Sequence, residues 1–439
     1  MKSISGKPVV LMMVDSPRRD LRWRIYMAAN LSKYGITSII GQRDYILPTH
    51  DNSKKAIWLG RFISNNGKVP GDKLLFETFK RNKTPVFFIH DEGGFHIKKY
   101  YNNTITERIH PIDIMKEDFI KKVYVWGEEQ KKILLDKARK ELKEKITISG
   151  SPKFEILENA EVGDEKWILA CTPFKVCNPG SQGIKPFSER AIDLAKDDTA
   201  GSMNEAHWHH LRYWKKTTDE FSEFIEMIDQ LSTKLPNENI VIRPHPDENA
   251  DYYKGLFSHR KNIEINSSGD AFYLIRNSKA VIHTESTTGL EALLCGKKTI
   301  NFRPLGEHDY VMLGLETAGT SAGNINEVLT CLQDEHPSKD ISNNKYINLN
   351  TNSLEKITDD LVSFINKNKV KSRCLIQNPE AEAPKEFDTK GKNYPYSIKE
   401  IETYLNEANQ KLNTAATIEQ QGFNHVIIKQ KTIAREQIE

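Results

Sequence analysis

The sequence predicts an α/β fold of two Rossmann-like domains followed by a C-terminal helical tail. Apolar runs of strand length alternate with amphipathic helical stretches, which is typical of a parallel, doubly wound sheet. This alternation occurs twice, with a polar segment at 159–165 between the two series. The length of 439 residues also fits two domains better than one core. We therefore expect domains at 1–160 and 161–368, and a connector with a helical tail at 369–439.

The first half contains six short apolar runs that we expect to be buried strands. A polar loop at 15–20 follows the first run, and helical stretches are expected at 21–34 and 128–142. The expected strands are 9–14, 37–40, 56–59, 86–89, 123–126 and 146–148.

The second half repeats the pattern more regularly. A polar stretch at 178–219 has no clear strand, so we interpret it as a large loop with helical parts. The tail is expected to hold a connector at 370–392 and an amphipathic helix at 397–412. The expected strands are 167–170, 240–242, 263–265, 280–282 and 299–302, and the expected helices are 221–235, 270–276 and 287–294.

Composition narrows the class of protein. The net charge is only +3, which argues against a nucleic-acid partner, since such proteins carry a dense basic face. The five cysteines form no CxxC pair, which favours free thiols in a reducing compartment. The start of the chain lacks a signal-peptide pattern, and its longest apolar runs have the length of strands. We expect a cytoplasmic protein that at most touches the inner face of the membrane.

The segment 240–248, IVIRPHPDE, is the most informative motif. A buried strand ends at Arg243, and ligands of parallel sheets bind beyond the carboxyl ends of the strands. The two prolines stiffen the loop, so His245 has a fixed direction. Arg243 and His245 are suited to bind a phosphate through charge-assisted hydrogen bonds. The alternative is a structural turn with a solvated histidine.

The segment 281–296, VIHTESTTGLEALLCG, is a second strand-to-helix junction. Free backbone N–H groups and the positive end of the helix dipole attract anions there. The candidate ligands are Ser286, Thr287, Thr288 and Gly289. Capping of the helix alone would explain the hydroxyls, but we expect this loop to lie on a strand next to that of Arg243, at the same sheet edge, which favours a joint phosphate site.

Two further junctions carry carboxylates. In VFFIHDEGGF, a strand is followed by His90, Asp91 and Glu92, of which one carboxylate at most can face a given substrate atom; such a carboxylate can act as a general base. In TISGSPKFE, a turn is followed by Lys153 and Glu155, which share a side if the chain is extended. A solvated turn and a surface ion pair are the alternatives.

Other candidates are weaker. Asp15, Arg18 and Arg19 follow the first strand and are within reach of the same edge. The HxHH cluster at 207–210 would need a distant fourth ligand to bind a metal ion. No DxD at a strand end, GxxxxGK[ST] or GxGxxG occurs, so we expect no metal, no P-loop and no dinucleotide cofactor.

Taken together, the four motifs resemble bacterial surface-carbohydrate biosynthesis proteins, including the retaining β-Kdo transferases of capsule and lipopolysaccharide assembly. The resemblance spans about residues 9–304, and HDEGG followed by GSPKFE is its most particular part. It implies a GT-B-like arrangement, with catalytic carboxylates mainly in the first domain and CMP mainly in the second. Glu155 and Lys153 stand where the family's GNPRFD-like motif has Asp and Arg, which allows a different donor sugar.

The resemblance also implies roles. His245, with Ser286 to Thr288, would hold the phosphate of a CMP-activated 2-keto sugar, Glu92 (or Asp91) would be the acid/base, and Glu155 would be the nucleophile. The acceptor would be a glycan or glycolipid, with peripheral contact to the inner membrane or to a polysaccharide assembly complex. A CDP-glycerol-type phosphotransferase or a nucleotide-sugar epimerase is the alternative enzyme, and a non-catalytic polysaccharide-binding scaffold is the alternative of another class.

Overall fold

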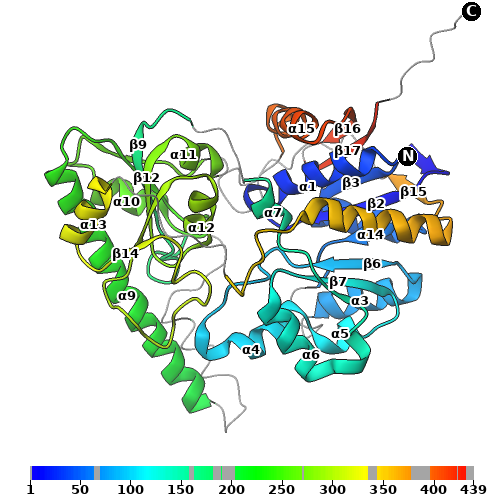
Figure 1. Ribbon diagram of the computed structural model, residues 1–439, viewed down its shortest axis with the longest axis horizontal. Coiled ribbons are helices and arrows are strands. Elements are labelled where there is room, and N and C mark those ends of the chain that lie inside the picture. The colour runs from blue at the N-terminus through cyan, green and yellow to red at the C-terminus, as the bar shows by residue number, and fades with distance from the viewer. Residues whose placement is uncertain are drawn as a thin grey trace, which may run out of the picture.

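The computed structural model has two α/β lobes side by side (Figure 1), and the predicted fold class is confirmed. It describes residues 2–63, 70–157, 163–180, 189, 203–268, 271–334, 344–376, 396–422 and 424–431. Residues 159–162, most of 181–202 and 377–392 of the segments expected as boundary, loop and connector lie outside the described residues.

The first lobe is built on an eight-stranded sheet of order β16-β17-β3-β2-β5-β6-β7-β8. The strands from β3 to β8 run parallel, because helices return the chain to the same end of the sheet. These strands are β2 (Val9–Val14), β3 (Thr37–Gln42), β5 (Ile57–Leu59), β6 (Val86–Ile89), β7 (Ile120–Val125) and β8 (Ile146–Ile148).

Helices cover both faces of this sheet, and β2 and β3 are buried along their whole length. A small separate sheet of order β1-β15-β4 joins two strands from the start of the chain to β15 (Arg373–Ile376). The remaining elements are β1 (Lys2–Ser5), α1 (Pro17–Ser32), α2 (Arg43–Asp51), β4 (Ser53–Lys54), α3 (Pro70–Asn82), η1 (Lys98–Tyr100), α4 (Tyr101–Asn103), the π-helical η2 (Thr104–Ile109), α5 (Ile112–Met115), α6 (Glu128–Leu142) and α7 (Pro152–Glu155).

The second lobe has a six-stranded parallel sheet of order β11-β10-β9-β12-β13-β14. Its elements are β9 (Trp167–Cys171), α9 (Met203–Lys234), β10 (Ile240–Arg243), α10 (Ala250–Leu256), β11 (Ile263–Ile265), α11 (Phe272–Arg276), β12 (Ser278–His283), α12 (Thr287–Leu294), β13 (Lys298–Phe302), β14 (Thr320–Ala322) and α13 (Ile325–Gln333).

Helix α9 corrects the expected loop at 178–219. The prediction began the helix at 221, but α9 starts at 203 and has 32 residues. The N-terminal half of α9 mixes charged, histidine and aromatic residues, which obscures the apolar periodicity of a helix. This half contacts the first lobe through aromatic rings, with the ring centroids of Tyr100 and His209 4.6 Å apart. The helix runs along the outer edge of the second lobe (Figure 1).

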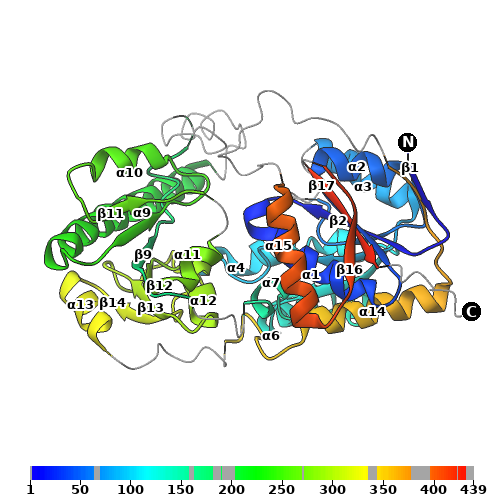
Figure 2. The same cartoon turned by 90° about the horizontal axis from the view of Figure 1, so that it is seen from above.

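The end of the chain returns to the first lobe, which Figure 2 shows from above. Helix α14 (Ser353–Asn368), expected in the second domain, packs on α1 and α7. Helix α15 (Ile398–Leu412) also packs on α1. The tail is not purely helical as expected, because β15 (Arg373–Ile376) and the hairpin of β16 (Ala416–Gly422) and β17 (His425–Gln430) are strands, and β17 extends the main sheet at β3.

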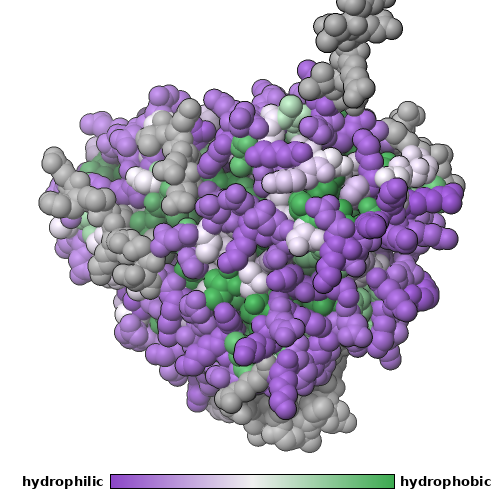
Figure 3. All heavy atoms as spheres, turned by 45° about the vertical axis from the view of Figure 1, so that its right-hand side comes forward, coloured by the Kyte–Doolittle hydropathy of each residue, from purple (hydrophilic) through white to green (hydrophobic). Residues whose placement is uncertain are grey.

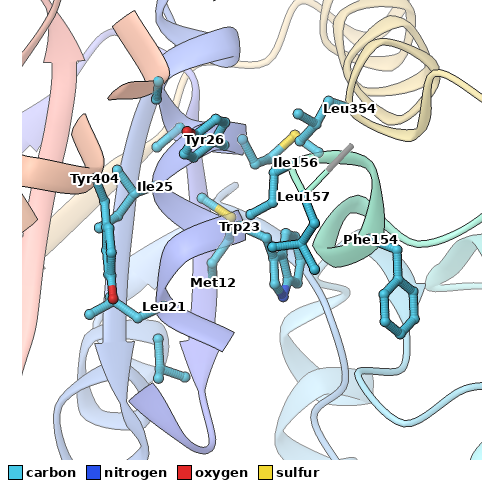
Figure 4. Close-up of a cluster of buried hydrophobic side chains, with 14 of the residues drawn as sticks. Met12, Leu21, Trp23, Ile25, Tyr26, Phe154, Ile156, Leu157, Leu354 and Tyr404 are labelled. Carbon is cyan, nitrogen blue, oxygen red and sulfur yellow. The ribbon is translucent and has the colours of Figure 1, made fainter. Parts of the chain in front are cut away.

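A buried apolar cluster ties this returning chain to the rest of the lobe (Figure 4). In this cluster, side chains from α1, the α7 segment, α14 and α15 face one another. The helices α14 and α15 therefore contribute to the core of the first lobe. The labelled residues are Met12, Leu21, Trp23, Ile25, Tyr26, Phe154, Ile156, Leu157, Leu354 and Tyr404.

The surface is mainly polar. On the face that Figure 3 shows, hydrophilic side chains surround small, scattered apolar patches. Among the helices that the structure describes, none combines the length and the apolar character needed to cross a bilayer.

A candidate nucleotide site between the two lobes

A cavity of about 580 Å³ lies between the lobes and is lined by residues of both. This volume suits a small organic ligand. Its lining is strongly basic, with eight cationic side chains against four carboxylates, which favours an anionic ligand. The cations are Arg18, Arg19, Arg22, Arg61, Arg108, Lys153, Lys175 and Arg243, and the carboxylates are Asp15, Glu92, Asp247 and Glu291.

The loop after β10 supplies Arg243 and His245 to this cavity. Arg243 donates to the carbonyl oxygens of Asn266 and Ser268, at 3.2 and 2.5 Å, which fixes its guanidinium. His245 Nδ1 accepts a hydrogen bond from the Asp247 N–H at 3.1 Å, so its own proton resides on Nε2. Burial and the nearby Lys175 lower the pKa of His245 to about 4. His245 is therefore a neutral Nε2–H donor at pH 7.

The start of α12 forms the neighbouring wall. Ser286 is the N-cap and its Oγ accepts from the Thr288 N–H at 3.2 Å. Ser286, Thr287 and Thr288 all line the cavity. The expectation that β10 and β12 are adjacent strands is wrong, because β9 lies between them. The two loops still share one edge, since all three strands are parallel.

Gly289 does not line the cavity and has a packing role. A Cβ at this position would lie 2.0 Å from His283 Nε2. The glycine thus allows α12 to pack on the end of β12, while His283 Nδ1 accepts from the Ser286 N–H at 3.2 Å. Gly289 therefore supports the Ser286–Thr288 turn through the contact with His283.

His90 and Glu92 come from the loop after β6 and line the opposite wall. His90 Nδ1 accepts from the Glu92 N–H at 3.0 Å, which again leaves the proton on Nε2. Burial and Arg61 lower the pKa of His90 well below its ordinary range. Burial alone would raise the pKa of Glu92, but Arg19, which donates to its carboxylate, brings it to about 2.

Arg19 is the centre of an ion-pair network behind this wall. It bonds Asp20 at 2.6 Å and Asp15 at 2.8 Å, and Arg61 reaches the same Asp15 at 2.5 Å. Asp20 is fully buried, where its carboxylate also accepts from the backbone N–H groups of Asp15 and Ser16. The network fixes Asp15 and Arg19 at the edge of the cavity.

Asp91 does not reach the cavity, which corrects its prediction as a catalytic residue. Its carboxylate points into the first lobe, where Arg24 donates to both oxygens at 3.1 and 2.9 Å and Trp23 Nε1 donates at 3.1 Å. Both members of the Asp91–Arg24 pair are buried. The chain turns after β6, and of the two adjacent carboxylates only that of Glu92 lines the cavity.

The side chains of Lys153 and Glu155 do not share a side, contrary to the prediction. Residues 152–155 form the helical turn α7, in which residues two apart lie on different sides. Lys153 lines the cavity and bonds Glu291 of the other lobe at 2.5 Å. Glu155 lies away from the cavity, and its Oε2 accepts from the Leu354 N–H at 2.8 Å at the start of α14. The prediction that Glu155 faces the substrate as a nucleophile is wrong for this geometry.

Several lining residues escape sequence reasoning. Arg22 lies on α1, where its guanidinium stacks on the Phe272 ring of the other lobe at 3.6 Å and bonds Glu407 of α15 at 2.5 Å. Arg108 reaches the cavity from the π-helical η2. Neither residue belongs to a motif. A run of arginines in residues 18–24 is the only signal in the sequence, and it does not tell which of them face the ligand.

Cys171 and the histidines of the HxHH cluster are poor candidates for a catalytic role in the cavity. Cys171 lines the cavity, but burial raises the pKa of its thiol to about 12, so it is a poor nucleophile. His209 and His210 of the HxHH cluster lie on α9 and do not line the cavity. Within the described ranges, no group of three or more His, Cys, Asp or Glu side chains is arranged to hold a metal ion.

Glu248 is buried directly after the Arg243–Asp247 loop, and its environment predicts that the stability of the fold depends on pH. Thr172 and Tyr253 donate to its Oε2 at 2.5 and 2.8 Å, and burial raises the pKa of Glu248 to about 8. The folded state therefore binds a proton that the unfolded chain releases near pH 4.5. This contribution to stability is complete below pH 4.5 and is lost as the pH rises through 8.

We expect Glu248→Gln to unfold at a higher temperature than the native protein at pH 8 and to lose less stability between pH 5 and pH 8. The difference should be on the order of 1–3 kcal/mol, because each pKa unit corresponds to about 1.4 kcal/mol and the amide leaves a buried donor unsatisfied. Thermal unfolding at both pH values measures it. Parallel pH profiles of the two proteins would show that Glu248 is not protonated in the fold.

The comparisons with known proteins agree with this architecture. A model of the capsule polysaccharide biosynthesis protein family matches residues 211–341, which include the loops at Arg243–Asp247 and Ser286–Thr288. No curated protein sequence matches the chain significantly.

Among solved structures, a putative UDP-N-acetylglucosamine 2-epimerase from Listeria monocytogenes has a TM-score of 0.50 at 11% identity, covering 82% of this chain and 97% of its own. The UDP-GlcNAc 2-epimerase of Methanocaldococcus jannaschii has a TM-score of 0.45 at 14% identity, covering 81% of this chain and 99% of its own. The wall teichoic acid polymerase TagF has a TM-score of 0.46 at 13% identity, covering 84% of this chain and 90% of that chain. The chain thus has a GT-B-like fold of two Rossmann-like lobes, and its second lobe is similar in sequence to capsule polysaccharide biosynthesis proteins.

Proposed function

We propose that this protein is a glycosyltransferase that moves a sugar from a CMP-activated donor, a 2-keto sugar acid such as Kdo, to a surface polysaccharide or glycolipid. The observation that carries the proposal is the meeting of two phosphate-suited loops, at Arg243–Asp247 and Ser286–Thr288, with the Glu92 wall of the other lobe in one basic cavity. The match to the capsule biosynthesis family over both loops supports surface-polymer synthesis.

The proposed binding mode follows from the donors in the cavity. His245 and His90 offer Nε2–H groups from opposite walls, and the start of α12 adds the hydroxyls of Ser286, Thr287 and Thr288 and the positive end of the helix dipole. These groups suit the phosphate of the nucleotide, whose negative charge increases as the bond to the sugar breaks. The surrounding cations also suit a carboxylate on the donor sugar.

In the proposed reaction, the acceptor hydroxyl oxygen forms a bond with the anomeric carbon while the bond from that carbon to the CMP phosphate oxygen breaks. Glu92 is ionised at neutral pH and faces the reacting sugar as a negative charge. It accepts the hydroxyl proton in the presence of the bound donor, whose negative charge offsets the positive charge of Arg19 and Arg61 and so raises the basicity of the carboxylate. Glu155 takes no part, since it lies away from the cavity.

Product analysis tests the proposal. Incubation with CMP-activated 2-keto sugars and a polysaccharide acceptor should give a new glycosidic bond and free CMP. A new phosphodiester would instead identify the CDP-glycerol-type phosphotransferase, and an isomerised sugar nucleotide would identify the epimerase. CMP should also raise the melting temperature more than CDP or UDP does. Tight CMP binding without turnover of any donor would favour the non-catalytic scaffold.

We also propose that the protein works at the cytoplasmic face of the inner membrane. The support is chemical: nucleotide-activated sugars are cytoplasmic substrates, and a glycolipid acceptor is anchored in a membrane. Retention of the protein on vesicles that contain the acceptor lipid, and not on neutral vesicles, would test this location.

A further inference from the structure

Glu285, directly before the phosphate-facing Ser286, has an unusual backbone conformation. Its φ is +42°, in the left-handed region that favours glycine. The other described non-glycine residues with positive φ lie at exposed positions, whereas Glu285 is 6% exposed. A buried, non-glycine residue in this region is strained, and strain of this kind persists only where surrounding contacts enforce it. The other residues are Lys55, Lys83, Lys369 and Asn413.

Contacts of both the backbone and the carboxylate of Glu285 hold its left-handed conformation. The Glu285 N–H donates to Asn301 Oδ1 at 3.0 Å. Its Oε1 accepts from Arg303 Nε at 3.1 Å, and its Oε2 accepts from the Met312 N–H at 3.0 Å. The strained turn is thus tied to the loop that follows β13. The turn in question is the one that orients Ser286 and Thr288 toward the cavity.

The segment around Met312 also forms backbone hydrogen bonds with the first lobe. Met312 forms an antiparallel bridge with Ile97, supported by Lys98 N–H to Val311 O at 2.9 Å and Leu313 N–H to His96 O at 3.1 Å. The ring of His96 in turn contacts the Glu92 carbonyl oxygen at 3.1 Å. Hydrogen bonds therefore run from the phosphate-facing turn to the loop of Glu92.

We propose that Glu285 is a positioning residue that ties the phosphate-binding turn to the interlobe bridge, and so sets the placement of the donor phosphate relative to Glu92. The proposal deepens the proposed function and rests on it for the identity of the ligand. Glu285 touches neither ligand nor reacting atoms. Its carboxylate fixes the turn on one side and, through Met312, the opposite wall on the other.

The test compares Glu285→Ala and Glu285→Gln with Glu307→Gln, an exposed control whose carboxylate lies 3.7 Å from the same Arg303. The first measurement is hydrogen exchange of the free proteins. Glu285→Ala should speed exchange in 96–98 and 311–313 at least tenfold, because the Met312 N–H loses its acceptor. Glu285→Gln, which retains one acceptor oxygen, should show a smaller increase, and Glu307→Gln none.

The second measurement is CMP binding and turnover. Glu285→Ala should weaken CMP binding about tenfold and also lower kcat, whereas Glu285→Gln should partly restore both. Unchanged exchange in 96–98 with a folded Glu285→Ala protein would overturn the positioning role, whether or not CMP binds. Failure of the native protein to bind CMP, together with the expected exchange pattern, would reject the nucleotide assignment and leave the role of Glu285 intact.

Discussion

Replacing Glu92 by glutamine should lower kcat for sugar transfer about 10²- to 10⁴-fold, the usual effect of losing a positioned acid/base group. Glu92 is the carboxylate of its loop that faces the cavity, and Arg19 keeps it ionised. Glutamine has nearly the same size but no charge and no basicity. The Michaelis constant for the donor should change little, because Glu92 in the proposed reaction acts on the acceptor hydroxyl and not on the donor phosphate. Steady-state kinetics with a CMP-sugar measures both constants.

Glu155→Gln is the matched control. Glu155 is the residue that the resemblance noted in the sequence would make a nucleophile, but here it accepts a hydrogen bond from the Leu354 N–H outside the cavity. The amide oxygen of glutamine retains that bond, so kcat should stay within about threefold of the native value. Equal losses in Glu92→Gln and Glu155→Gln, with native melting temperatures, would contradict the assignment of roles.

Much of the fold could be predicted from the sequence because apolar periodicity is a local signal. The strands at Val86–Ile89, Ile146–Ile148 and Ile263–Ile265, and the helices at Glu128–Leu142 and Thr287–Leu294, have the predicted bounds. The tail could not be predicted in the same way. Strand β17 pairs with β3, which lies far away in the chain, and local periodicity does not report such a tertiary pairing.

The candidate site was predictable where a residue follows a strand directly. Arg243 ends a buried strand, His90, Glu92 and His245 follow within three residues of one, and all four line the cavity. The direction in which a side chain points was harder to predict. The burial of Asp91 depends on Arg24, a residue of another element, and the separation of Lys153 from Glu155 depends on a single helical turn. Neither feature leaves a periodic pattern in the sequence.

His245→Ala should weaken nucleotide binding about 10- to 100-fold. A hydrogen bond to a charged phosphate contributes roughly 1.5–3 kcal/mol, and every 1.4 kcal/mol is a factor of ten in affinity. The hydrogen bond from the Asp247 N–H fixes the imidazole, and alanine removes its Nε2–H donor altogether. The control is His259→Ala, an exposed histidine beside Asp229 on the outside of the second lobe.

Calorimetric titration of CMP into the native protein, His245→Ala and His259→Ala is the most direct test of the central claim that the lobes grip a nucleotide phosphate between them. The account predicts one bound CMP per chain, native affinity for His259→Ala and at least tenfold weaker binding for His245→Ala. Equal CMP affinity in all three proteins would place the nucleotide elsewhere and contradict the account.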